Sequence, residues 1–213
     1  MSDSIFCFPF GKGSTVGSYA MYQMKLNQCA PAAIVNDSAE PIIATGAIIA
    51  EIPMIDGVDV TLLRNGDDLR VDADEGSLEL TNVTEQHVVT SIVISKGKVL
   101  LLRRSDKVGS FKGRWAGVSG FIGGHEADEE AARRELLEEI GMDSPRITRR
   151  IDPQMFRDRD NVWCVHPFLV EAKEPRIRTD WEHEKHEWVS PDKIKDYPTV
   201  PGLRQVICSL LGQ

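Results

Sequence analysis

Three glutamates in the second half of the chain have a spacing that could hold a metal ion. Glu135, Glu138 and Glu139 lie in a run, residues 129–140, of strong helix formers without Gly or Pro. Because residues three and four apart share a helix face, the three carboxylates should converge on one point. Carboxylates this close repel one another unless a cation lies among them, and oxygen-only ligands suit Mg²⁺ or Mn²⁺. The pattern therefore predicts a divalent metal that bridges to substrate phosphates.

The same run carries signals for the ends of a helix. Asp128 is the expected N-cap, and Gly141 is the expected glycine just past the end. Arg134 lies one turn before Glu138, where a guanidinium could hold that carboxylate through two hydrogen bonds. Arg134 is therefore expected to support the metal site. A separate apolar stripe could dock the helix on a sheet: Ala132, Leu136 and Ile140.

A glycine-rich loop precedes the helix. Gly120, Gly123 and Gly124 lack side chains, so this loop can fold tightly and approach a ligand or a metal. Glu126 ends the loop. The alternative interpretation of the whole segment is an acidic, solvated surface helix, because most charge runs are only that.

Residues 120–142 match every fixed position of the pattern G-x5-E-x7-R-E-U-x-E-E-x-G-U, where U is a bulky apolar residue. On that match, residues 83–213 resemble the Nudix hydrolases, which cleave diphosphate bonds in nucleoside diphosphates linked to another group. The resemblance implies an α/β fold, an αβα sandwich with a mixed sheet. It also implies Mg²⁺ or Mn²⁺ as cofactor, a small-molecule diphosphate as substrate and Arg134 as the residue that orients a glutamate. Glu138 and Glu139 are the expected catalytic pair among the metal ligands.

Two further segments of this half resemble Nudix substrate and base positions. The basic segment 103–115 is similar to the one that carries substrate, and Arg103 or Arg104 is expected to meet phosphate oxygens. The alternative is that one arginine is solvated and the other is paired with an acidic neighbour. In similar enzymes an acidic residue ahead of a tryptophan-valine strand adds a metal ligand or general base. Glu182 fits this position best, and Glu184 is the second choice.

Three ring side chains in this half are not expected to bind substrate or metal. Trp115 could stack on a base, but a tryptophan near glycine in a strand is more typical of a core. His183 and His186 are three residues apart and lack the H-E-x-x-H order of a zinc helix. They are expected to be solvated.

The first eighty residues indicate a different unit, built of short segments between Pro, Gly and Asn. The predicted segments are a strand at 4–10, a helix at 18–27, short β-like or buried segments at 32–35, 42–44, 48–52 and 68–71, and a linker at 79–87.

Three phrases in this half carry a second resemblance: FPFGKGSTVGSY at residues 8–19, APAAIV at 30–35 and IATGAIIAEIP at 43–53. They resemble the swivel domain of the aconitase X family, in particular the archaeal phosphomevalonate dehydratase small subunit. A small, truncated β/α domain over residues 1–82 is implied, with an iron–sulfur large subunit as partner. The family's catalytic base would map onto Ser14, although a serine there could instead bind a phosphate or cap a helix.

Composition limits the function further. With 213 residues and a net charge of −8, the chain is not expected to make extensive nucleic-acid contacts. No run of eighteen apolar residues and no signal-peptide pattern occurs, so a cytoplasmic protein without membrane contact is expected. The four cysteines are far apart and form no C-x-x-C pair, so neither a structural zinc site nor an iron–sulfur cluster is expected. They are interpreted as reduced, mostly buried thiols.

Several alternatives to a simple hydrolase stay open at this point. A Nudix-fold isomerase acting on isopentenyl diphosphate, a pure binding module, and a swivel subunit with a passenger hydrolase half all fit the sequence. A homodimer is also an expectation of the Nudix resemblance.

Overall fold

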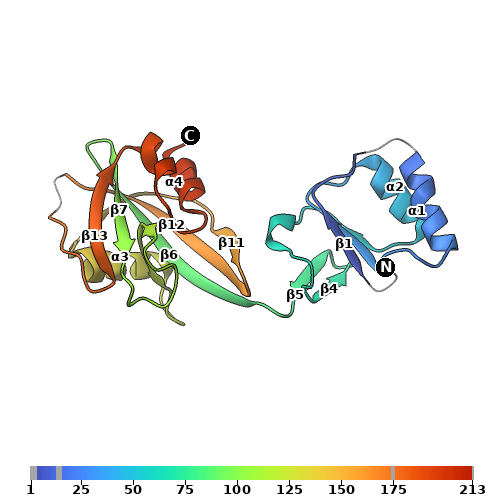
Figure 1. The fold of residues 1–213 in the computed structure, drawn as a ribbon, viewed down its shortest axis with the longest axis horizontal. Helices are drawn as coiled ribbons and strands as arrows, with labels where there is room; N and C mark the ends of the chain where they lie inside the picture. The colour runs from blue at the N-terminus through green and yellow to red at the C-terminus, as the bar shows by residue number, and fades with distance from the viewer. Residues whose placement is uncertain (1–3, 13–15, 174–175, 213) are drawn as a thin grey trace. The chain divides into compact units, whose positions relative to one another are not determined.

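The computed structural model describes residues 4–12, 16–173 and 176–212. The chain divides into two compact units, Met1–Val83 and Thr84–Gln213 (Figure 1). None of the described helices is long and apolar enough to cross a membrane.

The N-terminal unit is a small parallel sheet with two helices and a separate hairpin. Its elements are β1 (Ile5–Phe8), α1 (Val16–Leu26), β2 (Ala33–Asn36), α2 (Pro41–Ala50), β3 (Met54–Ile55), the 3₁₀ turn η1 (Val60–Leu62), β4 (Leu69–Asp72) and β5 (Ser77–Leu80). The sheet order is β1-β2-β3, and β4 pairs with β5 in antiparallel fashion.

Helix α2 corrects the prediction of two β-like segments at 42–44 and 48–52. An apolar run of this length fits a buried helix as well as a buried strand, and Pro41 at its first turn favours the helix. Gly46 does not break it. A Cβ there would lie 2.6 Å from Met21 Sδ and 3.1 Å from Ser18 Cα, so glycine lets α1 and α2 approach closely.

The predicted linker at 79–87 contains the boundary between the two units but is too long, because β5 extends to Leu80 and the next strand begins at Thr84. This strand starts with polar, mostly exposed residues that pair with a neighbouring strand, Thr84 opposite Asn161. Its early residues therefore lack the apolar pattern that predicts a strand.

The C-terminal unit is built on one eight-stranded mixed sheet. Its elements are β6 (Thr84–Ser95), β7 (Lys98–Arg104), β8 (Trp115–Ala116), β9 (Val118–Phe121), α3 (Asp128–Ile140), β10 (Arg146–Arg150), β11 (Gln154–Asp158), β12 (Asn161–Glu171), β13 (His183–Val189), the 3₁₀ segment η2 (Pro191–Asp196) and α4 (Leu203–Leu211). The main path runs β10-β12-β6-β7-β13, in which β12 and β6 are parallel and the other neighbours are antiparallel. Lys96 and Gly97, both with positive φ, form the tight turn between β6 and β7.

Helices cover both faces of this sheet, as the alternation of side chains along β6 shows. Val88 packs in a cluster with Val206 and Leu210 of α4. Its neighbour Val89 packs instead against Ala131 and Ala132 of α3. Since successive strand residues face opposite sides, α4 and α3 lie on opposite faces. The predicted αβα sandwich with a mixed sheet is confirmed.

Candidate active site

Helix α3 carries the glutamates, and its ends differ slightly from expectation. The N-cap is Ala127 rather than Asp128, whose side chain instead accepts a hydrogen bond from the Glu129 N–H at 2.8 Å. The carboxylate of Glu130 reaches back to the Ala127 N–H at 3.2 Å, which satisfies a donor at the helix start. Gly141 ends the helix with a φ of 68°, as predicted.

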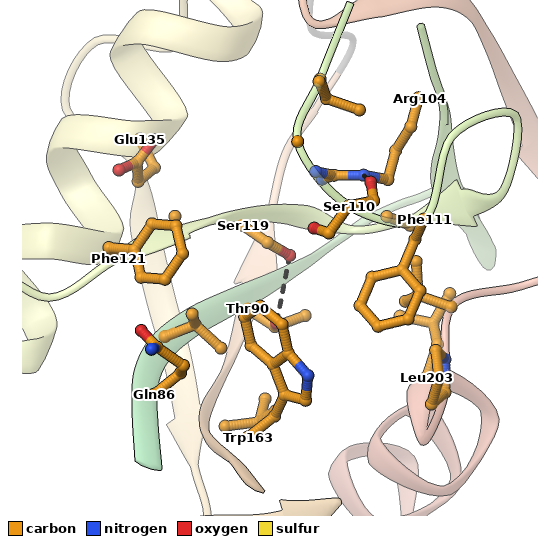
Figure 2. Close-up of a pocket in the computed structure, with 18 of the residues that line it drawn as sticks. Gln86, Thr90, Arg104, Ser110, Phe111, Ser119, Phe121, Glu135, Trp163 and Leu203 are labelled. Atoms are coloured by element: carbon orange, nitrogen blue, oxygen red, sulfur yellow. Dashed lines mark hydrogen bonds between the residues drawn. The ribbon is translucent and has the colours of Figure 1, made fainter. Parts of the chain in front are cut away.

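A cavity of about 660 Å³ lies beside α3, on the face of the sheet opposite its docked stripe. Figure 2 shows Glu135 on one side of this cavity, Arg104 on the other, and the ring of Trp163 between and below them. The lining residues that matter for chemistry are Arg104, Phe111, Ser119, Gly120, Phe121, Arg134, Glu135, Trp163, Trp181 and Glu182.

Glu135 lies at the cavity wall, against the backbone of Gly120. A Cβ on Gly120 would overlap the carboxyl group of Glu135, so only glycine leaves room for it. The Glu135 side chain is 12% exposed, and burial raises the pKa of this carboxyl, against the influence of Arg134. Gly123 and Gly124 do not line the cavity in the described part of the chain; the N–H of Gly123 donates to Glu126 at 3.2 Å.

Glu139 is the most deeply buried of the three glutamates, with 2% of its surface exposed. Its Oε1 accepts a hydrogen bond from the Ser119 N–H at 3.3 Å. Its Oε2 has no hydrogen-bond partner among the residues that the structure describes. Burial, and then the charge of Glu135, raise the pKa of Glu139 well above its ordinary value. A buried carboxylate oxygen without a donor is costly unless a proton or a cation satisfies it.

His183 stands behind Glu139, and the prediction that it is solvated is wrong. Its side chain is 1% exposed, and its Nε2 lies 3.7 Å from Glu139 Oε2. Its Nδ1 lies 3.2 Å from Oδ1 of Asp180, and burial lowers the pKa of the imidazole. His186 is exposed, as expected. Position explains the difference, because His183 opens β13 and its side chain is directed to α3.

Arg134 joins the glycine loop to the glutamates. Its Nε and Nη2 donate to Oε1 and Oε2 of Glu126 at 2.8 Å and 2.9 Å. Its Nη1 contacts Glu135 and lies 3.3 Å from Oε2 of Glu138. The pair of hydrogen bonds expected for Glu138 is therefore made to Glu126, and Arg134 lowers the pKa of Glu126 to about 2. Spacing along the helix could not reveal this contact, because Glu126 lies in the loop outside it.

The carboxylates fit a divalent cation by their chemistry. All donors are oxygens, and Glu135, Glu139 and Glu182 each have a pKa raised first by burial and further by other carboxylates nearby. Among the described residues these carboxylates do not form a group of three ligand atoms within 4.8 Å of one another, since Arg134 holds Glu135 and Glu138. A cation would relieve the repulsion and satisfy the free oxygen of Glu139.

The two arginines of the basic segment have different surroundings. Arg104 lines the cavity and its Nε donates to the carbonyl of Ser110 at 3.0 Å. Burial lowers the pKa of Arg104, while Glu139 and Glu182 oppose that shift. Arg103 is turned away and pairs with Glu184 at 3.1 Å. One arginine therefore meets the cavity and the other has an acidic partner.

Glu182 and Glu184 are separated in the same way. Glu182 lines the cavity, and burial followed by the charge of Asp180 raises the pKa of Glu182. Glu184 is exposed on β13 and does not line the cavity in the described residues.

The sequence did not reveal the aromatic lining of the cavity. Trp163 lies between Phe111 and Phe121, with ring centroids 5.7 Å and 6.1 Å away. Phe121 is 58% exposed and Trp181 is 60% exposed, so apolar faces are open to a ligand. These rings come from four separate segments that only the folded chain brings together. Trp115 is in the core, as predicted, with 6% exposure.

Comparisons with known proteins divide the chain in two. Residues 85–210 match the NUDIX domain model, and residues 1–80 match the model of the Aconitase X swivel domain. Both resemblances seen in the sequence are confirmed.

Relatives of the first part are small subunits of phosphomevalonate dehydratase. The protein from Thermococcus kodakarensis is 56% identical over 80 residues, which are 38% of this chain and 60% of that protein. The one from Methanosarcina mazei is 53% identical over 79 residues, 36% of this chain and 55% of that protein. The chain spans about three fifths of the length of these curated relatives.

Solved structures resemble the second part in fold. A MutT protein from Methanosarcina mazei Go1 aligns with a TM-score of 0.56 and 22% identity over 62% of this chain and 96% of the other. The NUDIX domain of Shewanella oneidensis NrtR, complexed with ADP ribose, aligns with a TM-score of 0.51 and 20% identity over 58% of this chain and 84% of the other. At these identities the likeness establishes the fold alone.

Proposed function

We propose a function that follows from a family: the chain belongs to the Nudix family of pyrophosphohydrolases. Its C-terminal unit, Thr84–Gln213, hydrolyses the diphosphate linkage of a nucleoside diphosphate derivative. One observation carries this proposal. Glu135 of the motif helix lines the same cavity as Arg104, Glu182 and the ring of Trp163. A substrate in that cavity would contact carboxylates, the guanidinium of Arg104 and an aromatic ring together.

Glu135, Glu138 and Glu139 are the proposed ligands of Mg²⁺ or Mn²⁺. When bound, such an ion supplies a Lewis acid for the phosphate oxygens and an activated water. Arg134 positions this set, since its guanidinium contacts both Glu135 and Glu138 and is anchored by Glu126.

Glu182 is the proposed general base. It would take the proton of the attacking water on a carboxylate oxygen, and it lines the cavity with Glu135. Its raised pKa brings it closer to the operating pH, which makes a carboxylate a better proton acceptor. Glu139 is the other candidate, but its buried position with one oxygen on Ser119 suits a ligand better.

The substrate class follows from the remaining lining. Arg104 is suited to phosphate oxygens, and Phe111, Phe121 and Trp163 offer ring faces to a planar group such as a base. A volume of about 660 Å³ is in the ordinary range for a cavity that holds a small molecule. These features favour a nucleoside diphosphate derivative over a diphosphate that lacks a ring.

A substrate panel tests this function. Purified chain with Mg²⁺ is incubated with nucleotide sugars, ADP-ribose, nucleoside triphosphates, dinucleoside polyphosphates and isopentenyl diphosphate, and the products are separated by chromatography. Cleavage of a nucleotide by the wild type but not by Glu139→Gln supports the proposal. Conversion of isopentenyl diphosphate without phosphate release would identify an isomerase instead, and binding without turnover of any compound would leave a binding module.

We propose a second function for the N-terminal unit, Met1–Val83: contact with a large, iron–sulfur subunit of the dehydratase type. The favouring observation is an apolar surface. None of the eleven described residues of α1 is buried, and Tyr19 is 75% exposed. On α2, Ile48 is 77% and Ile49 51% exposed. Exposed apolar side chains on neighbouring helices are typical of a protein interface.

Co-purification tests this second function. A dehydratase-type large subunit from a Thermococcus is expressed with the chain, and the complex is isolated on a tag carried by the chain. Tyr19→Ser with Ile48→Ser should abolish the complex, whereas exchange of the exposed Arg70 to Ser should not. Ser14 lies outside the described residues, and its role as base stays a prediction, which dehydratase activity of the complex with Ser14→Ala would test. A homodimer likewise stays a prediction.

A further inference from the structure

A second group of metal-ligating side chains lies in the C-terminal unit, away from the glutamates. His87 on β6 pairs in register with Cys164 on the parallel strand β12, and His166 follows two residues later. One ligand atom from each of these side chains lies within 4.8 Å of the others. His87 Nδ1 is 3.3 Å from His166 Nε2, and Cys164 Sγ is 3.7 Å from the same nitrogen.

This group lies on the opposite face of the sheet from the proposed hydrolase cavity. Gln86 and Val88, on either side of His87, line the cavity, as do Trp163 and Val165 on either side of Cys164. Because side chains alternate between the faces of a strand, His87 and Cys164 point away from the cavity. The sheet therefore separates this group from the cavity.

Carboxylates fix the outer nitrogen of each imidazole. His166 Nδ1 lies 3.3 Å from Oδ2 of Asp128, and His87 Nε2 lies 3.1 Å from Oε1 of Glu85. A carboxylate accepts a hydrogen bond from the nitrogen that it faces, so a neutral imidazole in this position carries its hydrogen on the outer nitrogen. The two inner nitrogens then present lone pairs to each other at 3.3 Å. Such an arrangement is relieved by a cation between them, and a carboxylate behind a ligating histidine is the usual support of a metal site.

We propose that His87, Cys164 and His166 bind a zinc ion. Two imidazoles and a thiolate form a nitrogen and sulfur donor set without oxygen, which suits Zn²⁺ and not Mg²⁺. Three protein ligands leave the fourth tetrahedral position to water. The His87 side chain is 51% exposed, so the ion can enter from solvent.

The site would stabilise the part of the fold that carries the glutamates. It links β6 to β12, and through His166 it reaches Asp128, the first residue of α3. Because the ion binds the folded chain, it should raise the unfolding temperature.

Cobalt substitution is the sharpest test, since Co²⁺ bound to a thiolate gives a charge-transfer band in the near ultraviolet. The full chain is titrated with Co²⁺ and then Zn²⁺ in excess Mg²⁺, which occupies carboxylate sites. We expect the band to grow to one Co²⁺ per chain and to vanish when Zn²⁺ displaces it. Cys164→Ser should lose the band, and Asp128→Asn should keep it with an affinity about 10- to 100-fold lower.

Matched controls come from exposed residues elsewhere. Cys29 and Cys208 are exposed and Cys7 is half-buried, so the expectation of mostly buried thiols holds only for Cys164. Cys208→Ser and His186→Ala should leave the band and the stoichiometry unchanged. Absence of a thiolate band in the wild type, or its persistence in Cys164→Ser, would overturn the proposal. The wild-type titration decides the matter even if a variant fails to fold. Loss of hydrolase activity plays no part in this test, so the two proposals fail separately.

Discussion

The cavity and the opposite face of the β6–β12 strand pair offer different kinds of ligand. The cavity is lined by carboxylates, Glu135 from α3 and Glu182 from the loop before β13. On the opposite face the donors are two imidazoles and a thiol on the strands themselves. Hard oxygen donors suit Mg²⁺, and nitrogen and sulfur donors suit Zn²⁺. A single sheet can therefore keep two metals apart by offering each a donor set that the other disfavours.

The faces also differ in how firmly their donors are placed. His87, Cys164 and His166 are fixed by strand pairing and already lie close together. Glu135 and Glu138 are held by Arg134, and Glu139 is held through Ser119. A metal bound by these glutamates must therefore compete with Arg134 for their carboxylates. This competition favours an ion that binds together with the substrate phosphate, because the phosphate supplies further ligands. The opposite face is suited to permanent occupancy.

Glu139→Gln should have the largest effect, and it should affect the glutamate site without affecting the proposed zinc site. The amide keeps the size of the side chain but removes a charged oxygen from the proposed metal set, so kcat should fall by about 100-fold or more. Zinc stoichiometry on the other face should not change. Steady-state kinetics with the substrate found in the panel, and metal analysis of the same sample, measure both.

Glu129→Gln is the matched control for that variant. Glu129 lies on the same helix, is exposed and pairs with Arg133 at 2.7 Å on the outer face. It should turn over substrate at the wild-type rate. Equal rates for wild type and Glu139→Gln would remove Glu139 from the metal set.

Gly120→Ala should have the next largest effect. The new methyl group would occupy the place of the Glu135 carboxyl, which must move. A displacement of about 1 Å at a reacting centre can cost about 100-fold in rate, so kcat should fall by a similar factor while the fold persists. Circular dichroism checks the fold and kinetics checks the rate. Gly124→Ala is the control, since a Cβ there meets no described atom within 4 Å; a rate as low as that of Gly120→Ala would contradict the explanation.

The cavity face could be predicted from the sequence because a helix has a fixed period. Glu135, Glu138 and Glu139 lie within five residues, and the loop glycines precede them in a recognisable pattern. The hairpin turn at Lys96 and Gly97 could be predicted because it depends only on neighbouring residues. The fold of the Nudix unit could be predicted because its motif is recognisable in the sequence. The helix period also predicts a supporting role for Arg134, but its main partner, Glu126, can be identified only from the folded loop.

The opposite face could not be predicted, because it depends on register. His87 and Cys164 are far apart in the chain, and only the parallel pairing of β6 with β12 brings them together. The spacing of cysteines along the chain carries no information on cross-strand neighbours. The same reason hid His183, whose buried contact with Glu139 joins a strand to a helix.

Trp163→Ala tests whether the cavity recognises a planar group. The substitution removes the ring between Phe111 and Phe121, and stacking on a base contributes about 1–3 kcal/mol. KM should rise by about tenfold for a nucleotide substrate with little change in kcat, because the ring does not touch the reacting phosphate. Trp181→Ala, at the exposed rim, is the control and should change KM less. An unchanged KM in Trp163→Ala would show that the ring serves only the fold.

The smallest effect is one of pH on stability, and it belongs to the cavity face alone. Burial raises the pKa of Glu139 well above its value of 4.5 in the unfolded chain, so the folded state holds the proton more tightly. The stability of the metal-free protein should therefore be complete below pH 4.5 and decline as the pH rises through the folded pKa. His183 and Glu126, whose pKa values are lowered, have the opposite sign: they cost stability as the pH falls and so cannot produce a loss of stability as the pH rises.

The difference in unfolding temperature between wild type and Glu139→Gln, followed above pH 4.5, reports the Glu139 contribution. As the pH rises, the unfolding temperature of the wild type should fall relative to that of Glu139→Gln. Mg²⁺ should reduce this fall, because the ion replaces the lost proton. Zn²⁺ bound at Cys164 should raise both unfolding temperatures equally at neutral pH. If the difference in unfolding temperature between the wild type and Glu139→Gln does not change with pH, Glu139 is charged in the folded protein and has a partner other than a proton or a metal.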